Sequence, residues 1–189
     1  MAESALPPRI MLASGNWFDL LDPWNSVFTI EDIAHGLSNI CRYAGQCRKF
    51  YSVAEHSVLV SSVVQECKLE ALLHDATEAF LGDITRPLKQ LLPCYGELEK
   101  RIETVIFERF GLDLKARREI AAVDLSVLAA EQALMMPKGT DAWAIKAGIV
   151  PAEIRIRYLS PGKARSSFMQ RFKHLCDHIR HKDDAAAAA

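Results

Sequence analysis

Residues 69–83, which read LEALLHDATEAFLGD, constrain this chain more than any other stretch. Apolar side chains recur there at helical spacing, which predicts one helix that ends near Gly82. His74, Asp75 and Glu78 interrupt the apolar pattern, and Asp83 follows the glycine. Buried ionisable groups need a partner, and a divalent cation suits a neutral histidine beside an ionised aspartate. The pattern therefore favours a metal site, with a solvated acidic face and a stray histidine as the alternative.

A second histidine and a third carboxylate occupy similar settings elsewhere in the chain. His56 lies on the apolar side of a helix predicted over residues 52–67, and Asp124 lies in the apolar stripe of a helix predicted over residues 115–136. The alternatives are a histidine satisfied within the core and an aspartate paired with Arg117 or Lys115. If these helices pack against residues 69–83, they bring four candidate ligands together. The four are His56, His74, Asp75 and Asp124.

Helix start and stop signals divide most of the chain and predict an all-α helical bundle. Thr29-Ile30-Glu31-Asp32 and Ser52-Val53-Ala54-Glu55 resemble capping boxes, in which the first and last side chains bond each other's backbone amides. Further helices are expected over residues 29–43, 85–93 and 95–110 and from residue 160 onward. Extended structure is expected at residues 154–159 and in a small N-terminal β-hairpin or extended segment, where apolar runs flank Ser14-Gly15-Asn16.

The length of 189 residues suits one domain, which we place at residues 9–180. Residues 1–8 and the alanine-rich segment 181–189 are expected to be disordered. A net charge of −1 leaves no basic field for a nucleic acid polymer. The chain has no apolar run of about 18 residues for crossing a membrane and no signal-peptide core, so we expect a cytoplasmic protein. Five cysteines without a CxxC pair predict free thiols rather than a disulfide framework.

Two aromatic or basic positions suggest a ligand pocket. Arg42 lies on a polar stripe of the predicted 29–43 helix, which is either ordinary surface or one wall of a pocket. Trp17, in the N-terminal segment, is either a packing residue or an aromatic wall for a flat ligand such as a nucleobase.

Two imidazoles and two carboxylates define a mixed nitrogen and oxygen site for one divalent ion. Such ligands accept Mn, Co, Zn, Fe or Mg, and the choice among these metals stays open. Four protein ligands leave room for water or a phosphate oxygen only in a five- or six-coordinate ion. A bound ion would polarise a phosphoryl oxygen and lower the pKa of water.

The ordered pattern H…HD…D resembles the HD-domain metal-dependent phosphohydrolases. The runs ICRYAGQCRKFYSVAEHSVLVS and ALLHDATEAFLGDITRPLK resemble the branch that contains bacterial HD-domain 5′-deoxynucleotidases and phage deoxynucleotide hydrolases. The resemblance covers residues 28–135 and rests most on HD followed by Glu three residues later and by GD, with RY and EHS upstream. It implies an HD-domain helical bundle.

The resemblance also implies roles for individual residues. The four candidate ligands, His56, His74, Asp75 and Asp124, would bind the metal, with Asp113 as the fallback for Asp124. Arg42 would orient a 5′-phosphate, and Glu78 would position or deprotonate water. Asp83 would act as a general acid or contact the sugar. Tyr43, at a position that is Trp in some members of the family, would contact the sugar, and the choice between ribose and deoxyribose stays open. The phosphate and sugar site would be completed by Thr85, Arg86 and Lys89.

The implied activity is removal of phosphate from (deoxy)nucleoside 5′-monophosphates. One alternative is a dNTP triphosphohydrolase that releases nucleoside and triphosphate, with charge supplied by His35, Lys49, Arg86 and Lys89. A second is a non-catalytic module that binds metal and nucleotide. The expected partner is the nucleotide, with neither nucleic acid polymer nor membrane. A homodimer is conceivable through the apolar face of the last helix, which could equally belong to the core.

Overall fold

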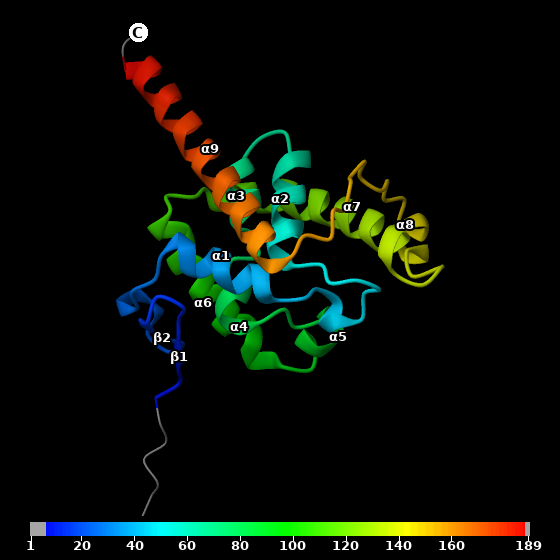
Figure 1. Cartoon of the computed structure of the whole chain (residues 1–189), viewed down its shortest axis with the longest axis horizontal. Coiled ribbons are helices and arrows are strands. Elements are labelled where there is room, and N and C mark those ends of the chain that lie inside the picture. Colours follow the sequence, from blue (N-terminus) through cyan, green and yellow to red (C-terminus); the bar gives the residue numbers. More distant parts are fainter. Residues whose placement is uncertain (1–6, 188–189) are drawn as a thin grey trace, which may run out of the picture.

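The computed structural model describes residues 7–187. The chain is mostly helical, with one two-stranded antiparallel sheet near the N-terminus, which confirms the predicted fold class at that level (Figure 1). The helices are α1 (Ile30–Asn39), α2 (Val53–Val63), α3 (Lys68–Leu73), α4 (Glu78–Leu81), α5 (Arg86–Lys89), α6 (Pro93–Arg109), α7 (Arg117–Met135), α8 (Ala142–Lys146) and α9 (Pro161–Ala187). Short 3-10 turns lie at Pro23–Asn25, Tyr43–Gly45 and Leu114–Ala116.

The predicted N-terminal hairpin is present as β1 (Arg9–Met11) and β2 (Trp17–Asp19), with Ile10 opposite Phe18. Gly15 makes the turn with a φ of 87°, a conformation that glycine adopts without steric cost. The Pro8 carbonyl accepts a hydrogen bond from the Leu20 amide at 2.9 Å, so the pairing between the two segments continues one residue beyond the strands. Residues 1–6 lie outside the described residues.

Residues 69–83 do not form the single helix that their spacing predicts. The amides of Ala76, Glu78 and Ala79 donate to carbonyls three residues earlier, so a tight turn separates α3 from α4. The two short helices pack against different neighbours: α3 against α2 and α9, and α4 against α1. One straight helix could not satisfy both sets of contacts. His74 and Asp75 therefore lie on a turn between two helices.

The α1–α4 contact is unusually close because Gly36 faces Ala79. A Cβ atom added at Gly36 would lie 2.9 Å from both the Cα and the Cβ of Ala79. Beside this contact, Phe80 of α4 stacks on Phe18 of the hairpin with ring centroids 3.9 Å apart, and Phe28 meets both rings edge-on. The hairpin thus packs on α4 through aromatic rings and helps to fix the segment that follows Asp75.

The capping predictions were right at one helix and half right at the other. Thr29 and Asp32 form a complete capping box at α1. At α2, the Ser52 side chain accepts a hydrogen bond from the Glu55 amide, but the Glu55 carboxylate does not accept one from the Ser52 amide. It accepts the Arg157 and Leu159 amides at 2.7 and 2.8 Å. Glu55 therefore ties the irregular 151–160 segment to α2.

The last helix, α9, continues to Ala187 and so includes residues 181–187 of the segment predicted to be disordered. Alanine has the highest helix propensity, which favours this conformation. The C-terminal half of α9 projects away from the other helices (Figure 1). The first half is core, with Ala164, Phe168 and Leu175 buried. Within residues 7–187, no helix combines the length and apolarity needed to cross a membrane.

Candidate metal centre and adjoining cavity

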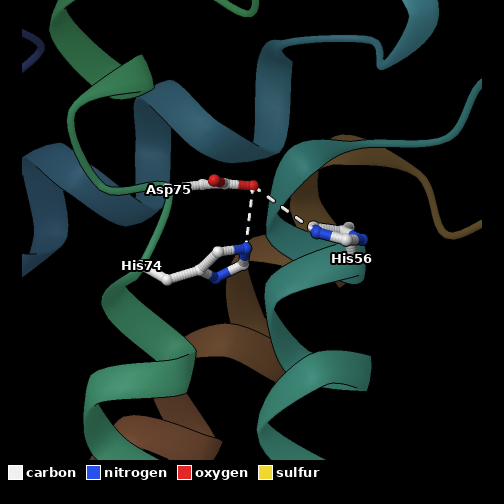
Figure 2. Close-up of side chains that lie close together, drawn as sticks. All are labelled: His56, His74 and Asp75. Atoms are coloured by element: carbon white, nitrogen blue, oxygen red, sulfur yellow. Dashed lines mark ion pairs between the residues drawn. The ribbon is translucent and has the colours of Figure 1, made fainter. Parts of the chain in front are cut away.

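Two histidines and an aspartate converge from separate parts of the chain. His56 comes from the first turns of α2, and His74 and Asp75 come from the turn between α3 and α4 (Figure 2). Asp75 Oδ2 lies 3.2 Å from His74 Nε2 and 3.5 Å from His56 Nε2. One ligand atom from each of the three residues lies within 4.8 Å of the others, so the group could bind a metal ion.

Asp124, the predicted fourth ligand, reaches the same place from α7. Its Oδ1 lies 3.1 Å from His56 Nε2 and 3.9 Å from His74 Nε2. The fallback residue Asp113 is elsewhere: it is exposed, and its carboxylate accepts the Lys115 amide at 2.8 Å. The geometry therefore brings together all four residues of the predicted ligand set.

The hydrogen bonds of the two imidazoles leave their Nε2 atoms for a cation. His74 Nδ1 donates to the Ala71 carbonyl at 2.8 Å, and His56 Nδ1 donates to Glu131 at 2.6 Å. Both Nε2 atoms are buried without a hydrogen-bond partner among the described residues. Asp124 lies near His56 Nε2, but the two atoms do not have hydrogen-bond geometry. An outer hydrogen bond that fixes the tautomer is typical of metal-binding histidines, so these residues fit a metal ion.

Without a metal, the same nitrogens are protonation sites. Burial and Arg42 both oppose a positive charge on His56. Together, Glu131 and Asp124 outweigh them and raise the pKa of His56 to about 10. The pKa of His74 is also raised, because Asp75 overcomes the effect of burial. Burial opposes ionisation of Asp75, but the two histidines and Arg42 hold its pKa well below the usual value.

Sequence reasoning missed Glu131, which is fully buried beneath the centre. Its Oε1 accepts from the Tyr51 hydroxyl and from His56 Nδ1, both at 2.6 Å. Its Oε2 accepts from the Tyr43 hydroxyl at 2.8 Å and from Arg42 Nη2 at 3.2 Å. Burial alone would raise the pKa of Glu131, but Arg42 and His56 lower it to about 2. Glu131 is therefore an ionised carboxylate that holds a candidate metal ligand and the predicted phosphate-binding arginine.

A signal for Glu131 exists in the spacing along α7. Glu131 follows Asp124 by seven residues, which is two helical turns, so both lie on one face of the helix. This spacing is a weak signal, because the surrounding run LAAEQAL has no polar stripe that would distinguish Glu131 from an ordinary surface glutamate.

A cavity of about 430 Å³ opens beside the centre. Most of the residues predicted to form the site line this cavity. They are Arg42, Tyr43, Asp75, Glu78, Asp83, Thr85, Arg86, Lys89 and Asp124. Its other walls are formed by Ile84, Pro87, Leu125, Leu128 and Gln132. Residues from α4 to α5 thus face residues of α7 across the cavity.

Trp17 does not line this cavity, and its role as an aromatic wall for a flat ligand stays a prediction. Side chains alternate along a strand, and in β2 the buried Phe18 takes the inward position. Trp17 points the other way with 55% of its surface exposed, opposite Met11. Two of the charges considered for a triphosphate are also elsewhere. His35 is exposed on α1, and the Lys49 ammonium lies 5.1 Å from the centre of the Tyr158 ring.

Arg42 lies between two carboxylates at the cavity wall. Its backbone amide donates to the Tyr51 carbonyl at 2.9 Å, which fixes the segment after α1. The side chain is 11% exposed, with Nη2 3.2 Å from Glu131 and Nη1 3.6 Å from Asp75. Nε has no partner among the described residues. The two carboxylates thus hold the guanidinium in place, and its Nε–H group is left to donate a hydrogen bond to a ligand.

Two carboxyl groups on the cavity wall have raised pKa values. For Glu78, burial is the main cause, followed by the charges of Asp75 and Asp83, and its Oε2 is buried without a partner in the described structure. For Asp83, burial and Asp75 outweigh the opposing effect of Arg42. Carboxyl groups with raised pKa values beside a cavity can transfer protons near neutral pH.

The fold and this centre define a helical protein with a His-His-Asp group beside a polar cavity. No protein family model matches the chain. It is 45% identical over 150 residues to "Uncharacterized protein YfdR" of Escherichia coli strain K12, a match that covers 78% of this chain and 84% of that protein. It is 43% identical over 112 residues to "Uncharacterized protein RCAP_rcc00048" of Rhodobacter capsulatus, covering 53% and 57%. The chain belongs to the family of YfdR.

Proposed function

We propose that this protein is an HD-domain metal-dependent phosphohydrolase that removes phosphate from (deoxy)nucleoside 5′-monophosphates. The observation that carries the proposal is the pair of buried Nε2 atoms of His56 and His74, which have no hydrogen-bond partner among the described residues and lie near Asp75 beside a polar cavity. The sequence resemblance supplies the reaction class, and the cavity volume lies within the range of about 300–1,000 Å³ typical of small-molecule sites.

His56, His74, Asp75 and Asp124 would hold one divalent ion. Neutral imidazoles and carboxylates accept Mn, Co, Zn, Fe or Mg. Such an ion supplies positive charge that stabilises phosphoryl oxygens and makes water more acidic. Glu131 would keep His56 in the tautomer that leaves Nε2 free, because it accepts the bond from Nδ1.

The chain's own groups would carry the proton transfers. Arg42 would donate hydrogen bonds to the phosphate from a guanidinium already fixed by Glu131. Burial and the neighbouring carboxylates raise the pKa of Glu78, so it is the ionised form of Glu78 that would take a proton from the attacking water as the water oxygen bonds to phosphorus. The bond between phosphorus and the 5′-oxygen would break, and Asp83, whose pKa is raised, would protonate that oxygen. The products would be a nucleoside and orthophosphate.

The charge of the cavity favours one phosphate over three. Lys89 is already paired with Glu99 at 2.7 Å, and Arg42 is shared between Glu131 and Asp75. Among the described lining residues, Arg86 is the cation without an ion pair. A triphosphate would bring more negative charge than these groups can balance. We therefore favour the monophosphatase over the triphosphohydrolase.

The test is to add Mn, Co, Zn or Mg back to metal-free protein with nucleoside mono- and triphosphates and to separate the products. We expect orthophosphate from monophosphates. His74→Ala should abolish turnover, while His174→Ala, an exposed histidine of α9, should not change it. Glu78→Gln should bind metal normally and lose at least about 100-fold in kcat.

Each other outcome rejects a specific part of the proposal. Release of triphosphate from a dNTP would identify the triphosphohydrolase. Metal and nucleotide binding without any product would identify a binding module. Full activity of Glu78→Gln would remove Glu78 from the mechanism.

A further inference from the structure

Residues of α7 line the cavity over about two helical turns, from Asp124 to Gln132. Asp124 lies at the candidate metal centre, and Gln132 follows it by eight residues, a rise of roughly 12 Å along the helix. Between them, Leu125 and Leu128 line the cavity. This length suits a nucleotide whose phosphate is held at the candidate metal centre beside Asp124 and whose base reaches Gln132.

The amide of Gln132 has a fixed orientation. Trp143 of α8 donates from its indole Nε1 to Gln132 Oε1 at 2.5 Å. An indole nitrogen can only donate, so the amide oxygen must face Trp143 and the NH2 group must face away from it. No hydrogen bond from this NH2 group is formed within the described part of the chain. Gln132 therefore offers donors, and not an acceptor, to a ligand in the cavity.

We infer that Gln132 is a specificity-determining residue that selects bases with a keto group over bases with an amino group at the same position. A carbonyl oxygen would accept from the Gln132 NH2 group, whereas an exocyclic amine would meet it donor to donor and leave both unpaired. The preferred substrates are then hypoxanthine or guanine over adenine nucleotides, and uracil or thymine over cytosine nucleotides. This inference rests on the proposed nucleotidase function.

Matched substrate pairs test the preference directly. dIMP has a keto group where dAMP has an amino group, and dUMP has a keto group where dCMP has an amino group. In each pair, the keto base also carries a proton on the adjoining ring nitrogen, which the amino base lacks. For the wild-type protein with metal, we expect kcat/KM to be about five- to tenfold higher for the keto member of each pair, the value of one hydrogen bond.

Two variants separate orientation from bulk. In Gln132→Glu, one carboxylate oxygen still accepts from Trp143 and the other faces the cavity as an acceptor, so the preference should reverse towards dAMP and dCMP. In Trp143→Phe, the amide is free to turn, so the ratio within each pair should fall towards one. Gln170→Glu, the same change at an exposed position of α9, should leave both ratios as in the wild type.

The failures of the inference and of the proposed function can be told apart. Equal kcat/KM within both pairs, or a Gln132→Glu variant with unchanged ratios, would overturn the inference while the nucleotidase function stands. If no nucleotide is hydrolysed, the proposed activity fails, and calorimetric Kd values with Mn²⁺-loaded protein still compare the pairs. A keto preference in those Kd values that reverses in Gln132→Glu would support the inference, and equal or undetectable binding would overturn it.

Discussion

At the scale of single residues, Glu131 shows how a buried charge can organise a site without facing its ligand. It contacts one candidate metal ligand, the predicted phosphate-binding arginine and two tyrosine hydroxyls, and it is fully buried. Outer contacts of this kind set the tautomer and the position of metal ligands. Glu131 therefore links the candidate metal centre to the cavity wall.

Replacing Glu131 by Gln should weaken metal binding about 10- to 100-fold, because His56 would lose a charged acceptor. The variant should also unfold at a lower temperature, because Arg42 would lose a buried counter-charge. Calorimetric titration with Zn²⁺ and a thermal melt measure the two effects. Glu97→Gln, an exposed position on α6, is the matched control. Unchanged metal affinity in Glu131→Gln would show that the His56–Glu131 bond does not position the ligand.

Metal binding should release protons at neutral pH. The pKa of His56 is about 10 in the metal-free protein, against 6.5 for a free histidine. The stabilisation from protonated His56 is therefore fully present below about pH 6.5 and is lost as the pH rises through 10. A metal needs the deprotonated Nε2, so its affinity should rise with pH across this window. Calorimetry at pH 7 in buffers of different ionisation enthalpy should detect about one released proton or more per ion. A binding enthalpy independent of the buffer would contradict this.

The sequence was sufficient to predict the four candidate ligands but not what holds them. His56, His74, Asp75 and Asp124 are conspicuous because each is ionisable within an apolar pattern. Glu131 was missed because its hydrogen-bond partners lie 75 to 89 residues away in the chain. Trp17 lies outside the cavity lining because Phe18 takes the inward position in β2, and the alternation alone does not show which of the two faces inward.

At the scale of elements, the break between α3 and α4 decides where the histidine and aspartate lie. Periodicity along residues 69–83 predicts the apolar contacts correctly, with Leu72, Leu73 and Phe80 all buried. It does not reveal that those contacts go to different neighbours, because the pattern of a continuous helix and that of two helices joined by a tight turn are nearly the same. The α1 cap and the Gly82 stop were predictable because they depend on neighbours within a few residues, whereas the carboxylate of Glu55 bonds to the distant Arg157 and Leu159 amides.

The close crossing of α1 and α4 gives an element-scale prediction. Gly36→Ala should destabilise the fold by about 1–3 kcal/mol, because the new methyl group would overlap Ala79 and push α4 away. Displacement of α4 would also move Glu78, so the proposed phosphohydrolase activity should fall with stability. Chemical denaturation and turnover of a monophosphate measure both.

Gly96→Ala is the control for the effect of adding a methyl group to a helix. Gly96 lies in α6, and a Cβ there meets no heavy atom within 4 Å. This substitution should stabilise the protein by about 0.5–1 kcal/mol. If Gly36→Ala behaved in the same way, the α1–α4 crossing would have to be looser than described.

At the scale of the whole molecule, the candidate ligands join distant parts of the chain. His56, the His74–Asp75 turn and Asp124 come from α2, the α3–α4 connection and α7, so a bound ion would crosslink three segments. A ligand that binds only the folded state stabilises it by about 2.7 kcal/mol at 100 times its Kd.

Removing the metal with a chelator should therefore lower the melting temperature. For a protein of this size we expect a fall of about 5–10 °C, restored by adding the ion back. His74→Ala should melt at the same temperature with and without chelator, because the ligand set is incomplete. A chelator shift in His74→Ala as large as in the wild type would place the ion elsewhere.

The saturation of Glu131 has a consequence for how this family can change over time. A carboxylate offers about four lone-pair sites, and four donors already use them. Losing any one donor changes the balance of charge and hydrogen bonds for the other three, so the effects of substitutions should not add. Arg42, Tyr43, Tyr51, His56 and Glu131 should consequently be inherited as a block, and a homologue that has replaced one of them should have replaced others with it.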